Sequence, residues 1–289
     1  MLRNFYLGHQ LNRFSESTTN LSKFESTTLS SLNIGLLEIE IAVGQSVNAR
    51  IDLVLQKIRE MPSGVFDVIV LPELWAEGAF DLEACQKTDV KIQIKTLKQI
   101  GDLAKSKGVY IHAGTFPIKS ASGRMCNTAV IFSPIVDQEI RYEKIHLFGF
   151  DEGEKTVFES GSRVVCLDIS GIRIGISTCY DLRFSELYLQ QIRLGARILL
   201  LSASWPKMRI EQWKALLIAR AIEGQAYVIA CNATGISGKV ELGGCSMAID
   251  PYGNVMLLEK HSGFLKCTLD LDILERYRGV FPMLQDRRM

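Results

Sequence analysis

From residue 32 onward, short apolar runs alternate with longer segments in which apolar positions recur every three to four residues. The short runs are typical of strands buried on both faces, and the periodic segments are typical of amphipathic helices. Their alternation predicts an α/β fold. We expect helices at Val47–Arg59, Ile92–Lys105, Phe184–Leu194 and Ile210–Gly224. We expect strands at residues 33–41, 66–73, 108–116, 127–134, 163–169, 172–179, 196–204, 226–233, 245–251 and 254–259.

The first part of the chain, residues 1–31, differs from everything that follows. It is rich in Ser, Thr and Asn and has no sustained apolar period. We therefore expect a mobile or loosely docked N-terminal extension and a single domain over residues 32–289. Organelle targeting is an alternative for the extension: Arg3 and Arg13 lie among hydroxyl residues, whereas Glu16 and Glu25 count against it.

Composition restricts the class of protein. With 289 residues, of which 47% are hydrophobic and 22% charged, the chain can bury a large core. Its 33 basic and 32 acidic residues create no strong field, so we expect neither a nucleic-acid nor a membrane partner. No apolar run approaches the roughly 20 residues that span a bilayer, and the start lacks a secretory apolar stretch. We expect a cytoplasmic protein.

The cysteines and histidines argue against two kinds of site. The seven cysteines are an odd number without a Cys-x-x-Cys pair, which fits neither a disulfide framework nor a zinc centre. The four histidines show no metal-ligand spacing. No nucleotide-binding glycine motif or Gly-x-Ser-x-Gly turn is present. We expect no metal and no nucleotide.

The clearest local pattern surrounds Cys179. An apolar run ends in a polar turn at this residue and a helical pattern follows. The N-terminus of a helix stabilises a thiolate, so we expect the Cys179 pKa to lie below its usual value of about 8.5. A buried core cysteine is the alternative.

Two other polar residues interrupt apolar surroundings. Glu73 ends the run that begins at Phe66, where a carboxylate could face a site. Lys144 comes just before the apolar residues Ile145 and Leu147 and could serve as a cation. Taken singly, Glu73 fits a cap or surface turn, Lys144 fits an exposed strand face, and His146 fits a structural role better than a triad base.

Together the three form a chemical unit: a base for the thiol proton, a nucleophile, and a cation for a developing oxyanion. A carboxylate of ordinary pKa is a poor base towards a thiol. Such a unit therefore needs an environment that shifts these pKa values.

The residues around these positions are similar to the three signature blocks of the carbon–nitrogen hydrolase (nitrilase) superfamily: LPELW, YEKIHLF and STCYDLRFSELY. Their order and spacing match, and the resemblance covers about Leu32 to the C-terminus. It implies an α-β-β-α sandwich that commonly pairs into an α-β-β-α-α-β-β-α dimer, so we expect a homodimer or a higher homo-oligomer. These features are implied by the resemblance, since periodicity alone gives only α/β.

The resemblance also implies roles for particular residues. Glu73 would be the general base, Lys144 the oxyanion stabiliser and Cys179 the nucleophile that forms a thioester, with ammonia released first and no cofactor required. Many members have a second glutamate seven residues before a glycine, which here selects Glu154, although Glu152 and Glu159 are close enough to compete. The backbone N–H after the nucleophile, which belongs to Tyr180 here, would complete the oxyanion hole.

The substrate class is narrowed by the residues after the nucleophile. CYDLRF resembles the omega-amidase branch, which deaminates small carboxyamides, rather than the nitrilases. Arg183 could hold a substrate carboxylate, or could instead pair with Glu186 or Glu223. The loops around Trp75, Phe148–Phe158 and Trp205 are expected to shape the substrate pocket.

Three hypotheses follow for function. The first is hydrolysis of a small linear primary amide. The second keeps the same three residues but acts on an N-carbamoyl compound or a nitrile. The third is a non-catalytic binding or redox-sensing protein in which Cys179 is only a reactive thiol; it does not explain the matched glutamate and lysine.

Overall fold

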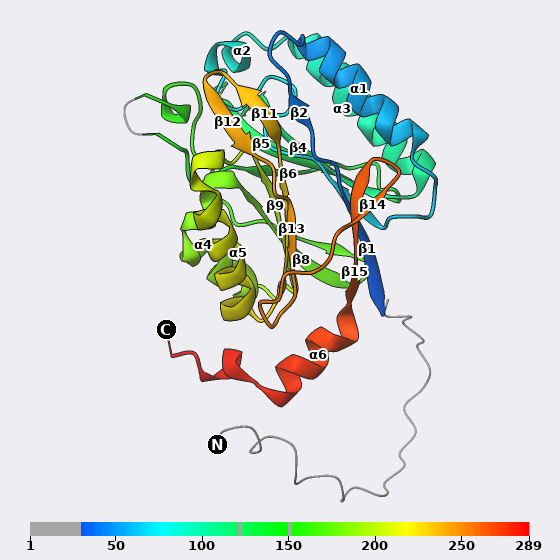
Figure 1. The fold of residues 1–289 in the computed structure, drawn as a ribbon, viewed down its shortest axis with the longest axis vertical. Helices are drawn as coiled ribbons and strands as arrows, with labels where there is room; N and C mark the ends of the chain where they lie inside the picture. The colour runs from blue at the N-terminus through cyan, green and yellow to red at the C-terminus, as the bar shows by residue number, and fades with distance from the viewer. Residues whose placement is uncertain (1–29, 121–122, 150–151, 289) are drawn as a thin grey trace, which may run out of the picture.

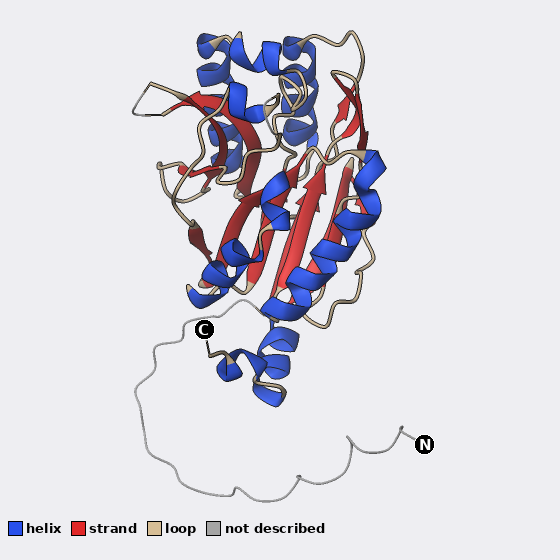
Figure 2. Ribbon diagram, turned by 90° about the vertical axis from the view of Figure 1, so that its left-hand side faces the viewer, coloured by secondary structure: helices blue, strands red, loops and turns tan. Residues whose placement is uncertain are grey.

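The computed structural model describes residues 30–120, 123–149 and 152–288. Two β-sheets lie face to face, with α1 and α3 covering one outer face and α4 and α5 covering the other (Figures 1 and 2). The layers form an α-β-β-α sandwich, as the family resemblance implied. In the described residues the larger sheet has the order β14-β15-β1-β3-β4-β5-β6. Its strands are Glu259–His261, Phe264–Asp270, Ser31–Leu36, Val68–Val70, Tyr110–Lys119, Met125–Phe132 and Ile140–Glu143.

The second sheet has the order β13-β10-β9-β8-β7 in the described residues. Its central strands β8, β9 and β10 are parallel, whereas β7 and β13 pair antiparallel at the two edges. The parallel strands bring several strand ends to one edge. The strands are Met247–Ile249, Tyr227–Asn232, Ile198–Ala203, Ile172–Thr178 and Cys166–Ile169.

Alternation along the strands explains the continuous apolar runs in the sequence. In β9, Ile198 and Leu200 pack between the two sheets, while Leu199 and Leu201 pack against the helices. Successive side chains point to opposite faces, so a strand that is covered on both faces needs apolar residues at every position.

The covering helices begin and end at residues suited to those positions. Ser46 caps α1 (Val47–Glu60) by accepting a hydrogen bond from the Ala49 N–H at 3.2 Å. Asp89 caps α3 (Val90–Lys107), which ends at Gly108 in the left-handed region with φ of 66°. On the other side lie α4 (Ser185–Arg193) and α5 (Ile210–Gly224). All four predicted helices are confirmed.

Two strand predictions differ from the structure. The run 33–41 divides into β1 and β2 (Glu40–Ile41), and β2 joins a separate sheet of order β12-β11-β2 in the described residues. The strand expected at 254–259 is wrong, because Val255 makes only an isolated bridge to Ile249 beyond the turn at Pro251. Strand β2 shares its sheet with β11 (Thr234–Ser237) and β12 (Val240–Gly243).

The remaining parts complete the molecule. Helix α2 (Leu82–Gln86) lies near the start of α3, and α6 (Leu271–Val280) carries the chain away from the sandwich (Figure 1). Four 3-10 helices connect described segments: η1 (Glu154–Thr156), η2 (Cys179–Arg183), η3 (Lys207–Arg209) and η4 (Met283–Asp286).

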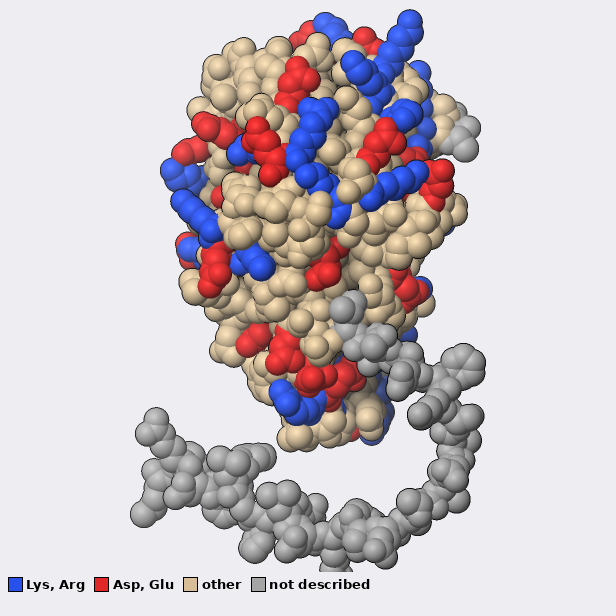
Figure 3. Space-filling model, turned by 90° about the vertical axis from the view of Figure 1, so that its right-hand side faces the viewer, with Lys and Arg blue, Asp and Glu red and all other residues tan. Residues whose placement is uncertain are grey.

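Three sequence predictions concern the chain as a whole. The expected extension, apart from Ser30 and Ser31, lies outside the described residues, and β1 begins at Ser31. Among the described helices, none has the length and apolar character needed to cross a bilayer. Basic and acidic side chains are interspersed on the face in Figure 3, in line with the balanced composition.

Candidate active site

Three strand ends deliver Glu73, Lys144 and Cys179 to one place. Glu73 follows β3, Lys144 follows β6 directly, and Cys179 follows β8 directly. All three line the same cavity of about 430 Å³, and their exposed fractions are only 1%, 1% and 7%. The structure thus brings together the three residues that the sequence selected from separate segments.

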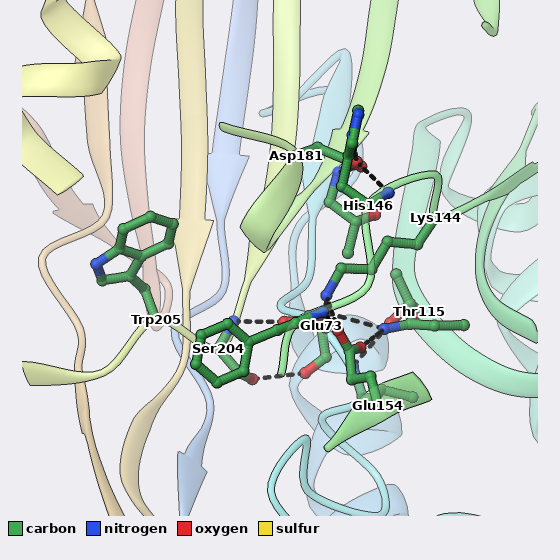
Figure 4. Close-up of polar contacts among 12 residues, drawn as sticks. Glu73, Thr115, Lys144, His146, Glu154, Asp181, Ser204 and Trp205 are labelled. Carbon is green, nitrogen blue, oxygen red and sulfur yellow. Dashed lines mark hydrogen bonds and ion pairs between the residues drawn. The ribbon is translucent and has the colours of Figure 1, made fainter. Parts of the chain in front are cut away.

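Lys144 is the centre of the polar contacts (Figure 4). Its Nζ lies 2.7 Å from Glu73 Oε1 and 2.6 Å from Glu154 Oε2. Asn127 Nδ2 donates to both carboxylates as well, at 2.9 Å to Glu73 and 2.8 Å to Glu154. One ammonium and one amide therefore fix two buried glutamates relative to each other.

The Glu73 carboxylate is also held from the second sheet. Its Oε2 accepts a hydrogen bond from the Ser204 N–H at 3.1 Å, and the Ser204 hydroxyl donates to the Glu73 carbonyl at 2.8 Å. The next residue, Leu74, has φ of 42°, and its N–H donates to Thr115 Oγ1 at 2.9 Å. A positive φ is costly for a non-glycine residue, so the surrounding bonds must maintain this turn.

The three candidate glutamates after the lysine occupy different environments. Glu154 is buried in contact with Lys144, and its Oε2 also accepts from the Phe148 N–H at 2.7 Å. Glu152 is exposed at the rim of the cavity. Glu159 forms an ion pair with Arg124. Only Glu154, among these three, is placed to act on Lys144.

Cys179 occupies a strained turn. It is the first residue of η2 and has φ of 46°, after which α4 begins at Ser185. A helical N-terminus at this residue was expected from the sequence. The positive φ was not, because nothing in the side-chain pattern reports the backbone angle of a cysteine.

The expected direction of the Cys179 pKa is wrong. Burial raises the pKa of the thiol well above its usual value, and the negative charge of Glu73 and their hydrogen bond raise it further. Lys144 acts in the opposite direction without reversing the result. The free site therefore holds a neutral thiol beside a carboxylate, rather than a thiolate formed in advance.

The other ionisable groups of the site respond to one another. Burial disfavours the Lys144 ammonium, but the charges of Glu154 and Glu73 oppose it, and the Lys144 pKa lies well above its usual value. Burial raises the pKa of Glu154, an effect that Lys144 opposes and Glu73 increases. Lys144 thus keeps its positive charge between the two glutamates.

Asp181 connects the segment that carries Lys144 to the segment that carries Cys179 (Figure 4). This fully buried carboxylate accepts from the Tyr142 hydroxyl at 2.7 Å and from the Thr178 N–H at 2.9 Å. It also accepts from the His146 N–H at 3.0 Å and contacts His146 Nδ1 at 2.8 Å. His146 thus has a structural position, as the sequence indicated.

Aromatic and cationic side chains line one part of the cavity. The Arg183 guanidinium lies 4.8 Å from the Trp205 ring centroid and 5.8 Å from that of Tyr180. Arg183 donates to Gln212 Oε1 at 2.8 Å, while Glu223 pairs with Arg220. Neither ion pair considered for Arg183 from the sequence is present among the described contacts.

Sequence reasoning missed Asn127, Ser204 and Arg209, whereas Phe148, at the start of a loop expected to shape the pocket, does line the cavity. Asn127 and Ser204 lie within or beside predicted strands, where a polar residue is also compatible with ordinary packing. Arg209 gave no signal because charged residues are common at the start of helices. In the described part of the chain, no cluster of His, Cys, Asp and Glu could hold a metal ion.

Comparison with known proteins identifies the family. The carbon–nitrogen hydrolase family model matches residues 34–278, which is most of the chain. The chain belongs to the carbon–nitrogen hydrolase family. A solved carbon–nitrogen hydrolase superfamily protein from Xanthomonas campestris shares the fold, with a TM-score of 0.81, 26% identity, and coverage of 90% of this chain and 98% of that chain.

Two curated relatives of this carbon–nitrogen hydrolase are named 2-oxoglutaramate amidase. The protein from Paenarthrobacter nicotinovorans is 38% identical over 244 residues, covering 81% of this chain and 83% of that protein. The protein from Bacillus subtilis is 34% identical over 223 residues, covering 77% and 85% respectively. The chain is thus an amidase that hydrolyses carbon–nitrogen bonds other than peptide bonds.

Proposed function

We propose that this carbon–nitrogen hydrolase uses Cys179 as nucleophile, Glu73 as general base and Lys144 as oxyanion stabiliser. The observation that carries the proposal is the meeting of these buried side chains in one cavity, with Lys144 Nζ 2.7 Å from Glu73 Oε1. A base, a nucleophile and a cation within one enclosed site are the requirements for acyl transfer.

In the acylation step, Glu73 takes the Cys179 proton as the sulfur attacks the amide carbon. The carbonyl electron pair moves to oxygen, where the Lys144 ammonium and the Tyr180 backbone N–H stabilise it. Collapse of this intermediate breaks the C–N bond, and the proton on Glu73 passes to the leaving nitrogen. Ammonia departs and a thioester on Cys179 remains.

In the deacylation step, Glu73 removes a proton from a water molecule that attacks the thioester carbon. Breaking the C–S bond returns the proton to the sulfur and releases the carboxylic acid. Glu154 and Asn127 keep Lys144 and Glu73 in place throughout, since Glu154 binds the Lys144 ammonium and Asn127 donates to both Glu73 and Glu154. Glu154 is therefore an auxiliary residue that acts through Lys144.

The raised thiol pKa favours proton transfer during the attack itself. In the free site, the charge of Glu73 opposes formation of a second anion at Cys179. Once the substrate oxygen begins to carry negative charge beside Lys144, that repulsion is offset, and the proton can move to Glu73. Substrate binding thus prepares the nucleophile.

We also propose a substrate class: small linear amides that carry a carboxylate at the other end, such as 2-oxoglutaramate. The names of the two curated relatives support it. The cavity contributes as well, since the half-buried Arg183 lines it together with the buried Glu73, Lys144 and Trp205. Arg183 would bind the carboxylate, and Trp205 would form part of the pocket wall.

Ammonia release tests the proposed function. We expect the wild-type protein to release ammonia from 2-oxoglutaramate and succinamate, and Cys179→Ala to lose this activity by at least a thousandfold. Full activity in Cys179→Ala would contradict the proposal. Turnover of N-carbamoyl compounds or nitriles alone would favour the hypothesis that the same three residues act on those substrates. Oxidation of the Cys179 thiol without turnover of any substrate would favour a non-catalytic binding or redox-sensing protein.

We further propose that the protein is a homodimer or a higher homo-oligomer. Aromatic side chains support this: the rings of Tyr252, which is exposed, and Tyr277, which is half-buried, lie 4.0 Å apart between centroids, and the exposed Phe281 lies 6.2 Å from Tyr277. Val280, 86% exposed, ends α6 beside them. An apolar cluster of this kind is typical of an interaction surface.

A cytoplasmic location for the protein stays a prediction from the sequence.

A further inference from the structure

Arg209 lies at the cavity entrance with its charge uncompensated. It is the last residue of η3, and its carbonyl accepts a hydrogen bond from Trp205 Nε1 at 2.9 Å, which fixes the backbone there. Within the described residues, no ion pair or hydrogen bond engages the Arg209 guanidinium, which lies 5.6 Å from the Phe148 ring centroid. By contrast, Lys207 in the same turn pairs with Glu241 at 2.7 Å.

Arg183 and Arg209 belong to one continuous arrangement of side chains. Arg183 lies over Tyr180, the Tyr180 ring meets Phe148 edge to face at 5.2 Å between centroids, and Phe148 supports Arg209. Trp205 contacts both arginines, because its ring lies against the Arg183 guanidinium and its Nε1–H donates to the Arg209 carbonyl. All five residues line the cavity.

Holding an arginine by aromatic faces has a consequence for binding. A ring beneath a guanidinium does not occupy its N–H groups, so those of Arg209, and those of Arg183 that do not bind Gln212, stay available to a ligand. A carboxylate is the partner that best matches this geometry, because it accepts two parallel hydrogen bonds. Among the described residues that line the cavity, Glu152 is the one exposed carboxylate near the two arginines.

We propose that Arg209 acts with Arg183 as a two-arginine clamp for the distal carboxylate of the substrate, and that Arg209 is a specificity-determining residue. The proposal rests on the proposed amidase function and deepens it. The amide end reaches Cys179 deep in the cavity, and the carboxylate remains at the entrance. Arg209 should therefore distinguish acidic amides from neutral amides of the same length.

The test compares succinamate with butyramide, in which a methyl group replaces the carboxylate. Arg209→Met should lower kcat/KM for succinamate about ten- to a hundredfold, the size of one charge-assisted hydrogen bond, and change kcat/KM for butyramide less than about twofold. Arg209→Lys, which keeps the charge, should recover part of the loss. Lys207→Met is the matched control in the same turn and should alter neither substrate.

A second readout does not depend on turnover. Calorimetry should show that succinate, the product of succinamate hydrolysis, binds Arg209→Met about tenfold or more weakly than it binds wild type and Lys207→Met. Equal losses on both amides, or unchanged succinate binding, would overturn the role of Arg209. If butyramide is hydrolysed through Cys179 while succinamate is not preferred, the amidase function stands and only the clamp is wrong.

Discussion

At the scale of single residues, the chemistry depends on a small group of charged side chains that are buried close together. Lys144 is within 2.7 Å of both Glu73 and Glu154, and Cys179 lines the same cavity. Removing one partner of a buried ion pair leaves an uncompensated charge, which is costly. Substitutions here should therefore alter the ionisation of the neighbouring groups as well as the rate.

Glu73→Gln provides a test of this coupling. The charge of Glu73 is a cause of the raised Cys179 pKa, so its removal should lower that pKa. Because the thiolate is the reactive form, we expect iodoacetamide to modify Cys179 faster at pH 7 in Glu73→Gln than in wild type, while turnover falls by at least about a hundredfold.

Glu152→Gln is the control for that experiment, since Glu152 is exposed at the rim and should affect alkylation little. Slower alkylation of Glu73→Gln than of wild type would contradict the direction assigned to Glu73. It would mean that Glu73 assists thiolate formation even without substrate.

The sequence predicted some site residues better than others for physical reasons. Glu73 and Cys179 stand where apolar strands stop abruptly, so both are visible in the pattern, whereas Lys144 follows Glu143 and was selected through the motif YEKIHLF. Asn127 stands at the start of a predicted strand, where no break in the apolar pattern marks it. Arg209 is positioned by contacts with Trp205 and Phe148, which the sequence does not reveal. Contacts between distant segments leave no local signal.

At the scale of elements, the turn that carries Cys179 is maintained by Asp181. Four contacts from Tyr142, His146 and Thr178 converge on its buried carboxylate. They join the end of β6 to the start of η2, so they fix the lysine and cysteine segments relative to each other. The strained φ of Cys179 requires such support.

Asp181→Asn should weaken this support without altering the reacting groups. An amide cannot accept from all four donors, so we expect the free energy of unfolding to fall by about 1–3 kcal/mol, measured by urea denaturation. We also expect kcat to fall on the order of tenfold or more, because small displacements of a nucleophile are costly.

Tyr142→Phe removes only one of the four contacts and should produce a smaller loss of both stability and kcat. A stable, fully active Asp181→Asn would show that the turn maintains itself. That result would contradict the role assigned to Asp181.

Elements with a strong period or clear caps were predicted well, and weakly patterned ones were not. Helix α3 has Asp89 at its start and Gly108 at its end, and both are readable in the sequence. By contrast, the alternating, half-exposed pattern of β15 was missed, and the apolar run at 254–259 forms no regular strand. Whether a segment of this kind becomes a strand depends on pairing with neighbouring strands, and the local sequence carries no information about that pairing.

At the scale of the whole molecule, the sandwich places the site where the two sheets meet. Glu73 and Lys144 come from the larger sheet and Cys179 from the smaller one, while Ser204 at the end of β9 reaches across to Glu73. Periodicity predicted α/β layers but could not specify this pairing. The arrangement of two sheets came from the resemblance of motifs to a known family.

The proposed oligomer can be tested by light scattering. We expect a mass of at least about twice the 32.3 kDa of one chain, because the cluster of Tyr252, Tyr277 and Phe281 should be covered by a second copy. Phe281→Glu should shift the protein towards the monomer. Ile135→Glu, at another exposed apolar position, is the control, and a wild-type monomer would contradict the proposal.

The most direct test of the central claim is mass spectrometry of the acid-quenched enzyme during turnover of succinamate. We expect the peptide containing Cys179 to carry a succinyl group as a thioester, and we expect this species to be absent from Cys179→Ala. Rapid turnover with no acyl group on Cys179 at any quench time, together with activity in Cys179→Ala, would contradict the assignment of Cys179 as the nucleophile.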